Sequence, residues 1–385
     1  MAASSLADIC REAGPAYRQL YGDRMLPSHL RALSDFAGCR TEALGGHVYS
    51  CQDCGELEYA YHSCRNRHCP RCQGDAAGKW AESVGKRLLP GGYFLLTFTI
   101  PAELRPLARA NQKLVYSKLL REAAASVLLL ANDPQWIGGR PAIANVLHTW
   151  ARDLTYHPHV HLLVTAGGLS PDGAWKFPPR RKFFIPGRIL SPIFRAKIRD
   201  ALSRAGLVDQ VKKQTWTRPW VVHVQDAGRG KEVLSYLSRY IYRVAISDDR
   251  IESFDRNQVT FAWWPRGEKA RRLMTLPVND FLARFLQHVL PKRFVKVRYF
   301  GLLAPNQHGN LETARRLLMT HQISSGPASP ETQSDTTQSL ETVADSSDTS
   351  RSIESQKAGP VKICRTCGKG VLMHIAVLPR RRRPP

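Results

Sequence analysis

The amino-acid sequence predicts a mixed α and β (α+β) protein with a small cysteine-rich N-terminal domain and a polar C-terminal tail. Three observations support this prediction. Strand-like and helix-like hydrophobic patterns alternate from about residue 93 to 289, seven of the nine cysteines lie before residue 73, and residues 323–360 are rich in serine and threonine. The 385 residues allow two or three folded units, and we expect boundaries near residues 88, 320 and 360.

The first expected unit, residues 1–88, is a zinc-binding DNA-recognition domain. It carries two C-x2-C pairs, Cys51 with Cys54 and Cys69 with Cys72, and this arrangement is typical of four thiolates around one tetrahedral zinc ion. Four more residues are candidate ligands of a second zinc ion: Cys39, His47, Cys64 and His68. Alternatively, these cysteines are small buried residues and the histidines are hydrogen-bonded or exposed.

Basic and aromatic side chains alternate between the two cysteine pairs. Arg65 and Arg67 lie in this stretch, shortly after Tyr59 and Tyr61. Arginines bind phosphates and aromatic rings stack on bases, so we expect Arg65 and Arg67 to contact DNA. The alternative is a solvated basic loop.

The second expected unit, residues 89–320, begins at the turn Pro90-Gly91-Gly92, which is followed by an apolar run. Periodicity predicts helices at 102–131, 187–205, 230–245 and 277–289, and strands at 93–100, 141–149, 158–166, 216–225 and 258–264.

A His-x-His pattern lies in the predicted strand at 158–166. Because side chains alternate across a strand, His159 and His161 share one face, where two imidazoles could bind a divalent metal ion. His148 and Asp153 are both candidates for a third ligand, and the sequence does not choose between them. Without further context, such a pair is more often simply hydrogen-bonded.

Two tyrosines and two arginines lie one turn apart on the predicted helix at 230–245. Tyr236 and Tyr240 form one row and Arg239 and Arg243 another, since residues i and i+4 share a helix face. The arginines could face DNA phosphates. For an isolated helix, core tyrosines and solvated arginines would be the simpler interpretation.

Residues 321–360 are expected to form a disordered linker, because a stretch with 15 Ser or Thr among residues 323–360 and no aromatic residue cannot bury much surface. Residues 361–385 form a basic tail that carries Cys364-x2-Cys367 and ends in an arginine run. Two thiols do not complete a zinc site within this tail, so its role stays open.

The charge balance points to a polyanionic partner. With 56 Lys and Arg against 32 Asp and Glu, the formal net charge is +24, which favours nucleic acid. No apolar run approaches the roughly 20 residues of a membrane-spanning helix, and the N-terminus does not resemble a signal peptide. We therefore expect a cytoplasmic protein without a membrane partner.

Taken together, these features resemble the insertion-sequence 91 family of rolling-circle transposases, the two-tyrosine branch of the HUH endonuclease superfamily. The resemblance covers Cys39 to about Ala304. It is carried by the stretches CRTEALGGHVYSC at 39–51, SCRNRHCPRCQ at 63–73, HTW at 148–150, YHPHVH at 156–161, YLSRY at 236–240 and FVKVRYFG at 294–301.

The resemblance implies an HUH-nuclease fold, in which helices flank an antiparallel sheet that carries the metal-binding histidines on a central strand. It assigns His159 and His161 to a catalytic Mg²⁺ or Mn²⁺, Tyr236 and Tyr240 to the nucleophiles, and the N-terminal cysteines to structural zinc. Tyr242 is a third phenol nearby. The implied activity is nicking and rejoining of single-stranded DNA at element ends through a 5′-phosphotyrosine intermediate, in a bacterial, nucleoid-associated protein of unknown oligomeric state.

Two alternatives share some of these features. A plasmid or phage-type replication initiator would use the same site but would more often carry a helicase domain, and no Walker motif is present in the sequence. A zinc-dependent DNA-binding regulator without nuclease activity would share the charge and the zinc sites, but it would not need paired histidines and tyrosines.

Overall fold

The computed structural model describes residues 5–73, 87–179, 184–229, 233, 243–265, 268, 270–324 and 362–381. It divides the chain into two compact units, one of Met1–Cys39 with Ser63–His321 and the other of Arg40–His62 with Gln322–Pro385. The expected boundary near residue 88 therefore does not separate the units. Instead, the expected first domain is shared between both of them.

The first unit contains most of the secondary structure. Its helices are α1 (Leu6–Glu12), α2 (Gly14–Tyr21), α3 (Pro27–Ala37), α5 (Arg105–Ala110), α6 (Gln112–Ala131), α7 (Gly187–Ser203), α9 (Val278–Leu286) and α10 (His308–Ser324). Its strands are β3 (Gly92–Thr99), β4 (Ala142–Trp150), β5 (Tyr156–Thr165), β6 (Gly168–Leu169), β7 (Trp175–Lys176), β8 (Val222–Arg229), β9 (Ile251–Phe254), β10 (Gln258–Trp263), β11 (Arg272–Pro277) and β12 (Val297–Gly301).

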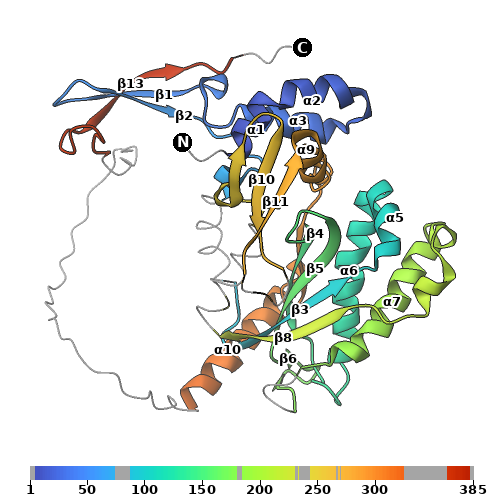
Figure 1. Cartoon of the computed structure of the whole chain (residues 1–385). Coiled ribbons are helices and arrows are strands. Elements are labelled where there is room, and N and C mark those ends of the chain that lie inside the picture. Colours follow the sequence, from blue (N-terminus) through green and yellow to red (C-terminus); the bar gives the residue numbers. More distant parts are fainter. Residues whose placement is uncertain are drawn as a thin grey trace, which may run out of the picture. The chain divides into compact units, whose positions relative to one another are not determined.

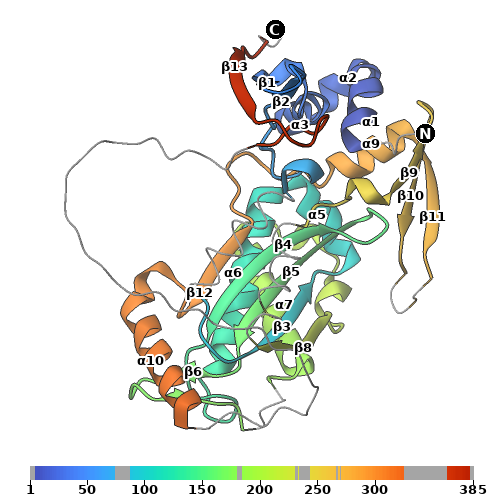
Figure 2. The same ribbon diagram turned by 90° about the vertical axis from the view of Figure 1, so that its left-hand side faces the viewer.

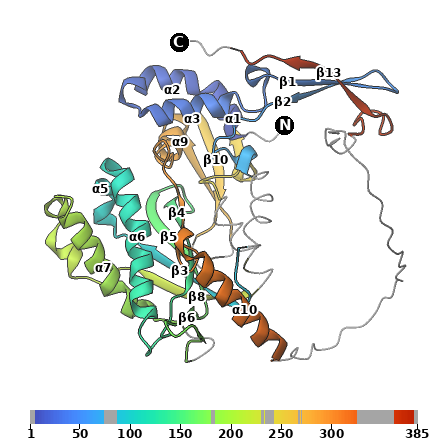
Figure 3. The same cartoon turned by 180° about the vertical axis from the view of Figure 1, so that it is seen from behind.

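A five-stranded antiparallel sheet in the order β12-β4-β5-β3-β8 forms the centre of this unit, and Figure 2 shows its strands side by side. Side chains alternate across each strand, so Phe94, Leu96 and Phe98 of β3 face one side of the sheet. That side is covered by α6 and α7 (Figures 1 and 3). The α+β class, with antiparallel sheet and flanking helices, is confirmed.

Helix α10 covers part of the opposite face of the sheet. Apolar residues of α10, such as Leu311 and Leu318, pack there against Ala144 and Leu163. The other end of this face carries histidines and threonines, among them His159, His161 and Thr97.

The N-terminal helices belong to a second core of the first unit. This core combines α1–α3 with α9 and the small sheet β11-β10-β9, and it includes Phe36, Phe261 and Phe281. At the start of α1, Ser5 and Asp8 form a capping box, in which the Ser5 hydroxyl accepts from the Asp8 amide and the Asp8 carboxylate accepts from the Ser5 amide.

The second unit is built on the three-stranded sheet β13-β1-β2, which joins β1 (Gly46–Cys51) and β2 (Leu57–Tyr61) to β13 (Leu372–Leu378) from the far end of the chain. Both pairings of β1 are antiparallel. The sequence did not predict any of these three strands.

Two other expectations differ from the structure. The strand expected at 216–225 begins only at Val222, because Pro219 lacks a backbone amide and the Trp220 amide donates to the Ser191 hydroxyl at 3.0 Å instead of to a sheet partner. The helix expected at 102–131 is interrupted at Asn111, which has φ −121° and ψ 45°. The expected disordered linker lies almost entirely outside the described residues, as does most of the helix expected at 230–245.

Among the described residues, no helix has both the length and the apolar character that a membrane crossing requires.

We predict that Gly301→Ala destabilises the first unit by more than about 2 kcal/mol. Gly301 has φ +60°, and an added Cβ would overlap the backbone carbonyl oxygen of Pro141 on the neighbouring chain segment. Gly309→Ala is the matched control, since Gly309 lies in the first turn of α10 with open space around it, so the substitution should change the stability by less than about 1 kcal/mol. Thermal and denaturant unfolding of both variants would test this, and equal stability of the two would contradict it.

Candidate functional site

Three histidines converge on the part of the central sheet that α10 leaves uncovered. In the register, His148 of β4 lies opposite His159 of β5, and Val146 lies opposite His161. Because residues two apart on a strand share a face, His159, His161 and His148 all project to the same side. One ring nitrogen of each lies within 4.8 Å of the others, which is compatible with a shared metal ion.

Neighbouring groups orient two of these rings. The Nδ1 atom of His159 donates to the backbone carbonyl of His157 at 2.7 Å, and Nδ1 of His161 lies 3.0 Å from the hydroxyl of Thr97 on β3. The Nε2 atom of each ring is therefore the candidate metal ligand, and hydrogen bonds of this kind typically fix metal-binding histidines. His148 is buried and stacks on Trp150 with a centroid distance of 4.6 Å.

The electrostatics favour neutral imidazole, the form that binds metal ions. Burial lowers the pKa of His159 to about 4. Burial also holds the pKa of His161 well below its ordinary value, and the nearby His159 and Arg243 add to this effect. Both rings are therefore uncharged at neutral pH.

This geometry favours His148 over Asp153 as the candidate third metal ligand. His148 is part of the three-histidine cluster, whereas Asp153 is not. The Asp153 carboxylate accepts from the amide and hydroxyl of Thr155, at 3.1 and 2.7 Å, and lies on the wall of the surrounding cavity.

The histidine cluster lines a cavity of about 700 Å³. Four arginines and two adjacent tryptophans also line it: Arg105, Arg152, Arg243, Arg250, Trp263 and Trp264. Of these six residues, only Arg243 was predicted from the sequence. Two of the arginines donate to backbone carbonyls. Arg250 donates to the carbonyls of Ala262, at 2.8 Å, and Arg152, at 2.6 Å, and Arg152 donates to that of Trp264 at 3.3 Å. Burial lowers the pKa of Arg250 to about 10, so it remains charged at neutral pH.

The predicted nucleophiles Tyr236 and Tyr240 lie outside the described residues, together with Tyr242 and Arg239. The described residues nearest to them in the chain are Val233 and Arg243. Val233 is buried in the apolar cluster on the same sheet face as the histidines, and Arg243 lines the cavity.

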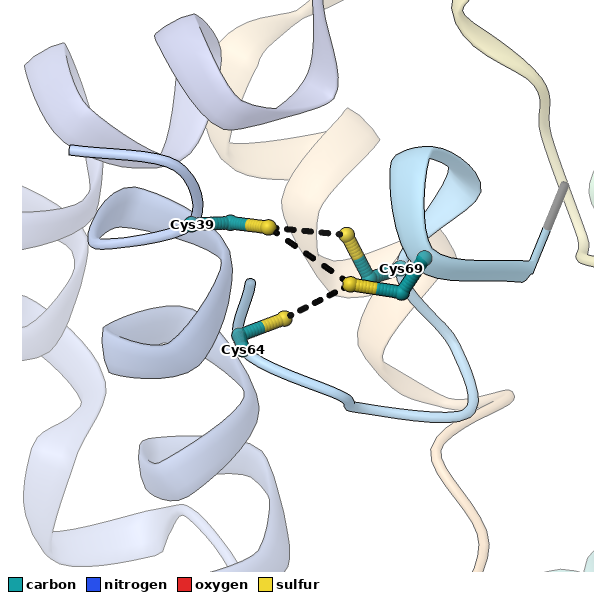
Figure 4. A group of neighbouring side chains, drawn as sticks. Cys39, Cys64 and Cys69 are labelled. Atoms are coloured by element: carbon teal, nitrogen blue, oxygen red, sulfur yellow. Dashed lines mark hydrogen bonds between the residues drawn. The ribbon is translucent and has the colours of Figure 1, made fainter. Parts of the chain in front are cut away.

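A four-cysteine cluster lies in the first unit (Figure 4), where Cys39 follows α3 and the other three cysteines come from residues 64–72. The Sγ atoms of Cys39 and Cys72 are 3.6 Å apart, those of Cys39 and Cys69 are 3.7 Å apart, and those of Cys64 and Cys72 are 3.6 Å apart. Zn–S bonds of about 2.3 Å in a tetrahedron place the sulfurs about 3.8 Å apart, so this cluster has the size of a zinc site.

The cysteine grouping predicted from the sequence was wrong. Cys69 and Cys72 share a cluster with Cys39 and Cys64, whereas Cys51 and Cys54 share a second cluster with Cys364 and Cys367. Neither His47 nor His68, the two histidines expected as zinc ligands, belongs to a cysteine cluster. The His68 Nε2 atom accepts from the Leu290 amide at 3.1 Å, and His47 Nδ1 lies 3.1 Å from His374 Nε2.

The two arginines between the cysteine pairs differ in their surroundings. Arg65 is exposed, as a DNA contact requires. Arg67 instead donates to the backbone carbonyls of Pro291, at 2.9 Å, and Phe294, which commits its guanidinium to contacts within the first unit. The sequence does not distinguish these two environments, because the partners of Arg67 lie more than 200 residues away in the chain.

Comparison with known proteins agrees with these features. A family model described as "Transposase zinc-binding domain" matches residues 9–100, and one described as "Putative transposase" matches residues 143–310. A protein named "Putative transposase y4qJ" from Sinorhizobium fredii is 36% identical over 351 residues, which cover 85% of this chain and 86% of that protein. The transposase for insertion sequence element IS801 from Pseudomonas savastanoi pv. phaseolicola is 30% identical over 291 residues, which cover 71% and 70% of the two chains.

The chain belongs to the insertion-sequence 91 family of transposases. No solved structure matches it. Membership of this family implies a DNA-processing enzyme that binds DNA. The matched zinc-binding domain and the two four-cysteine clusters support structural zinc in this transposase.

We predict that Cys69→Ser removes one zinc ion per chain and lowers the unfolding temperature of the transposase. Cys69 lies in the segment at residues 64–72 and is buried in the core that this segment shares with the N-terminal helices. A zinc ion bound by Cys69 would join the segment to Cys39 at the end of α3. Metal analysis of the purified variant and thermal unfolding would measure both effects. Cys10→Ala is the control, since Cys10 is buried in the same core but belongs to neither cluster. An unchanged zinc content in Cys69→Ser would contradict this assignment.

Proposed function

We propose that this transposase nicks and rejoins single-stranded DNA at the ends of its element through a covalent 5′-phosphotyrosine intermediate. The observation that carries this proposal is the cluster of three imidazoles in a cavity lined by arginines. A regulator that only binds DNA has no need for three converging histidines in such a cavity.

The donor set fits a divalent cation. Imidazole nitrogens bind first-row transition ions readily, and water or phosphate oxygens can occupy the remaining positions of the Mg²⁺ or Mn²⁺ that we propose as cofactor. Because all three donors are nitrogens, we expect Mn²⁺ to support the reaction at lower concentration than Mg²⁺. When bound by His148, His159 and His161, the ion would polarise the scissile phosphate and offset charge in the transition state.

The remaining residues of the cavity match a single-stranded nucleic acid. Arg105 and Arg152 provide positive charge for phosphates on either side of the scissile one, and Arg250, whose guanidinium donates to backbone carbonyls, adds to the positive potential of the cavity. Trp264 has 38% of its surface exposed beside Trp263, so it offers an aromatic surface on which an unpaired base could stack.

In the proposed reaction, the phenol oxygen of Tyr236 or Tyr240 attacks the phosphorus, and the 3′-oxygen of the preceding nucleotide leaves. The products are a 5′-phosphotyrosine and a free 3′-hydroxyl. A 3′-hydroxyl can later attack the same phosphorus and release the tyrosine, which joins strands without ATP. Two phenols one helical turn apart would allow a second cut before the first covalent strand has left.

We predict that His161→Ala lowers nicking of a single-stranded element-end oligonucleotide by at least about 100-fold, because it removes a metal ligand. DNA binding should change by less than about threefold, since the arginines and the net charge supply affinity. Gel assays with Mg²⁺ or Mn²⁺ and binding titrations would measure the two effects.

His223→Ala is the matched control for this experiment. His223 lines the same cavity from β8 but lies outside the histidine cluster, so its loss should leave most nicking intact. Wild-type nicking by His161→Ala would refute the metal assignment, and a wild-type protein that binds the oligonucleotide but never cleaves it would favour the regulator.

We also predict that Tyr236→Phe and Tyr240→Phe each abolish transposition in cells, that at least one of them still nicks in vitro, and that Tyr242→Phe is nearly active. On an ideal helix, Tyr242 is about 200° away from Tyr240, whereas Tyr236 lies on the same face as Tyr240. Mass spectrometry of the trapped phosphotyrosyl peptide would identify the nucleophile. An adduct on Tyr242 alone, or full transposition by Tyr236→Phe, would overturn the two-nucleophile hypothesis.

A further inference from the structure

We propose that the C-terminal segment completes a second structural zinc site, in which Cys364 and Cys367 join Cys51 and Cys54 around one zinc ion. The matched zinc-binding domain ends at residue 100, so it assigns no function to the two C-terminal cysteines. In the second unit, the Sγ atoms of all four cysteines lie within 4.8 Å of one another. The two halves of the site are 310 residues apart in the chain, counted from Cys54 to Cys364.

The sulfur separations fit zinc and exclude disulfides in this structure. The Sγ atoms of Cys51 and Cys367 are 3.7 Å apart, and those of Cys54 and Cys364 are 3.8 Å apart. A tetrahedral zinc ion with Zn–S bonds of about 2.3 Å requires sulfurs about 3.8 Å apart, whereas a disulfide requires about 2.0 Å. Zinc binding would release the thiol protons, so that four thiolates surround the ion.

The two halves of the site have the same local structure. Each half reads C-x2-C-G, and the glycine amide donates to the carbonyl of the first cysteine at 3.0 Å, from Gly55 to Cys51 and from Gly368 to Cys364. The glycines have φ +73° and +69°, which is the left-handed conformation that glycine adopts without strain. Two matching turns therefore each present a pair of thiols to the centre.

A third glycine, Gly370, lies close to the sulfur atoms of the site. The Gly370 amide donates to the Sγ atom of Cys367 at 3.3 Å, and its carbonyl accepts from the Cys364 amide at 2.8 Å. An added Cβ at Gly370 would overlap the Sγ atom of Cys51. The backbone thus approaches the thiols closely and supplies a donor to one of them, as expected around a thiolate cluster.

The apolar contacts of β13 are too few to account for its place in the sheet. It pairs with β1 along its length, but Met373, Ile375 and Val377 are 49, 55 and 62% exposed. Among the described residues of the second unit, the apolar cluster around the thiols has only Cys51, Cys364 and Leu372 as buried members. Zinc would replace a hydrophobic core here, as it does in small zinc-dependent domains.

The experiment replaces the zinc of the full-length transposase with Co²⁺ and measures the sulfur-to-cobalt charge-transfer absorption. This signal reports thiolate sites and does not detect the histidine cluster. We expect two thiolate-bound equivalents per wild-type chain and one in the double variant Cys364→Ser/Cys367→Ser. Thr366→Ala, between the two cysteines, is the matched control and should retain two.

Hydrogen exchange provides the second measurement. In the double variant, the amides of β13 should exchange at least tenfold faster than in Thr366→Ala, while those of β5 in the first unit keep their protection. Unchanged β13 protection or two remaining cobalt equivalents in the double variant would overturn the proposal. Should the double variant fail to fold, the wild-type titration alone decides: one thiolate-bound equivalent per chain refutes the second site, and two support it.

Discussion

The alternation of side chains along β5 is the constraint on which the arrangement of the first unit depends. Val160, Leu162 and Val164 point to the face under α6 and α7, where they belong to the main apolar core. The residues between them must then point to the opposite face, which places His159 and His161 together. The same ten residues therefore secure the sheet to its helices and present the proposed metal ligands.

The antiparallel register extends this constraint to the neighbouring strands. It places His148 of β4 opposite His159, and Thr97 of β3 opposite His161. Three proposed ligands and one orienting hydroxyl thus come from rigid central strands, which hold side chains more precisely than loops do. The arginines and tryptophans of the cavity come from segments outside these three strands, which suits contacts to a flexible substrate.

In each unit, a zinc-sized cysteine cluster joins separate segments of the chain. In the first unit, one cluster joins the end of α3 to the segment at residues 64–72. In the second, the proposed site would attach a C-terminal strand whose own apolar side chains stay exposed. A cluster of four thiolates is a strong cross-link for segments far apart in the chain, since its stability depends little on buried area.

The sequence by itself determined the α+β class, most of the central strands and the shared face of His159 and His161, because these follow from local periodicity. The strands of the second unit escaped prediction, since β1 and β2 have few buried residues and β13 pairs with a segment more than 300 residues away. Only the tertiary structure decided how the cysteines group: spacing identifies pairs of thiols, but which pairs meet depends on how the chain folds. The tertiary structure also decided that His148, and not Asp153, lies with His159 and His161, because strand register pairs residues that are far apart in the sequence. It likewise decided that Arg67 donates to backbone carbonyls, because these carbonyls lie more than 200 residues away in the chain.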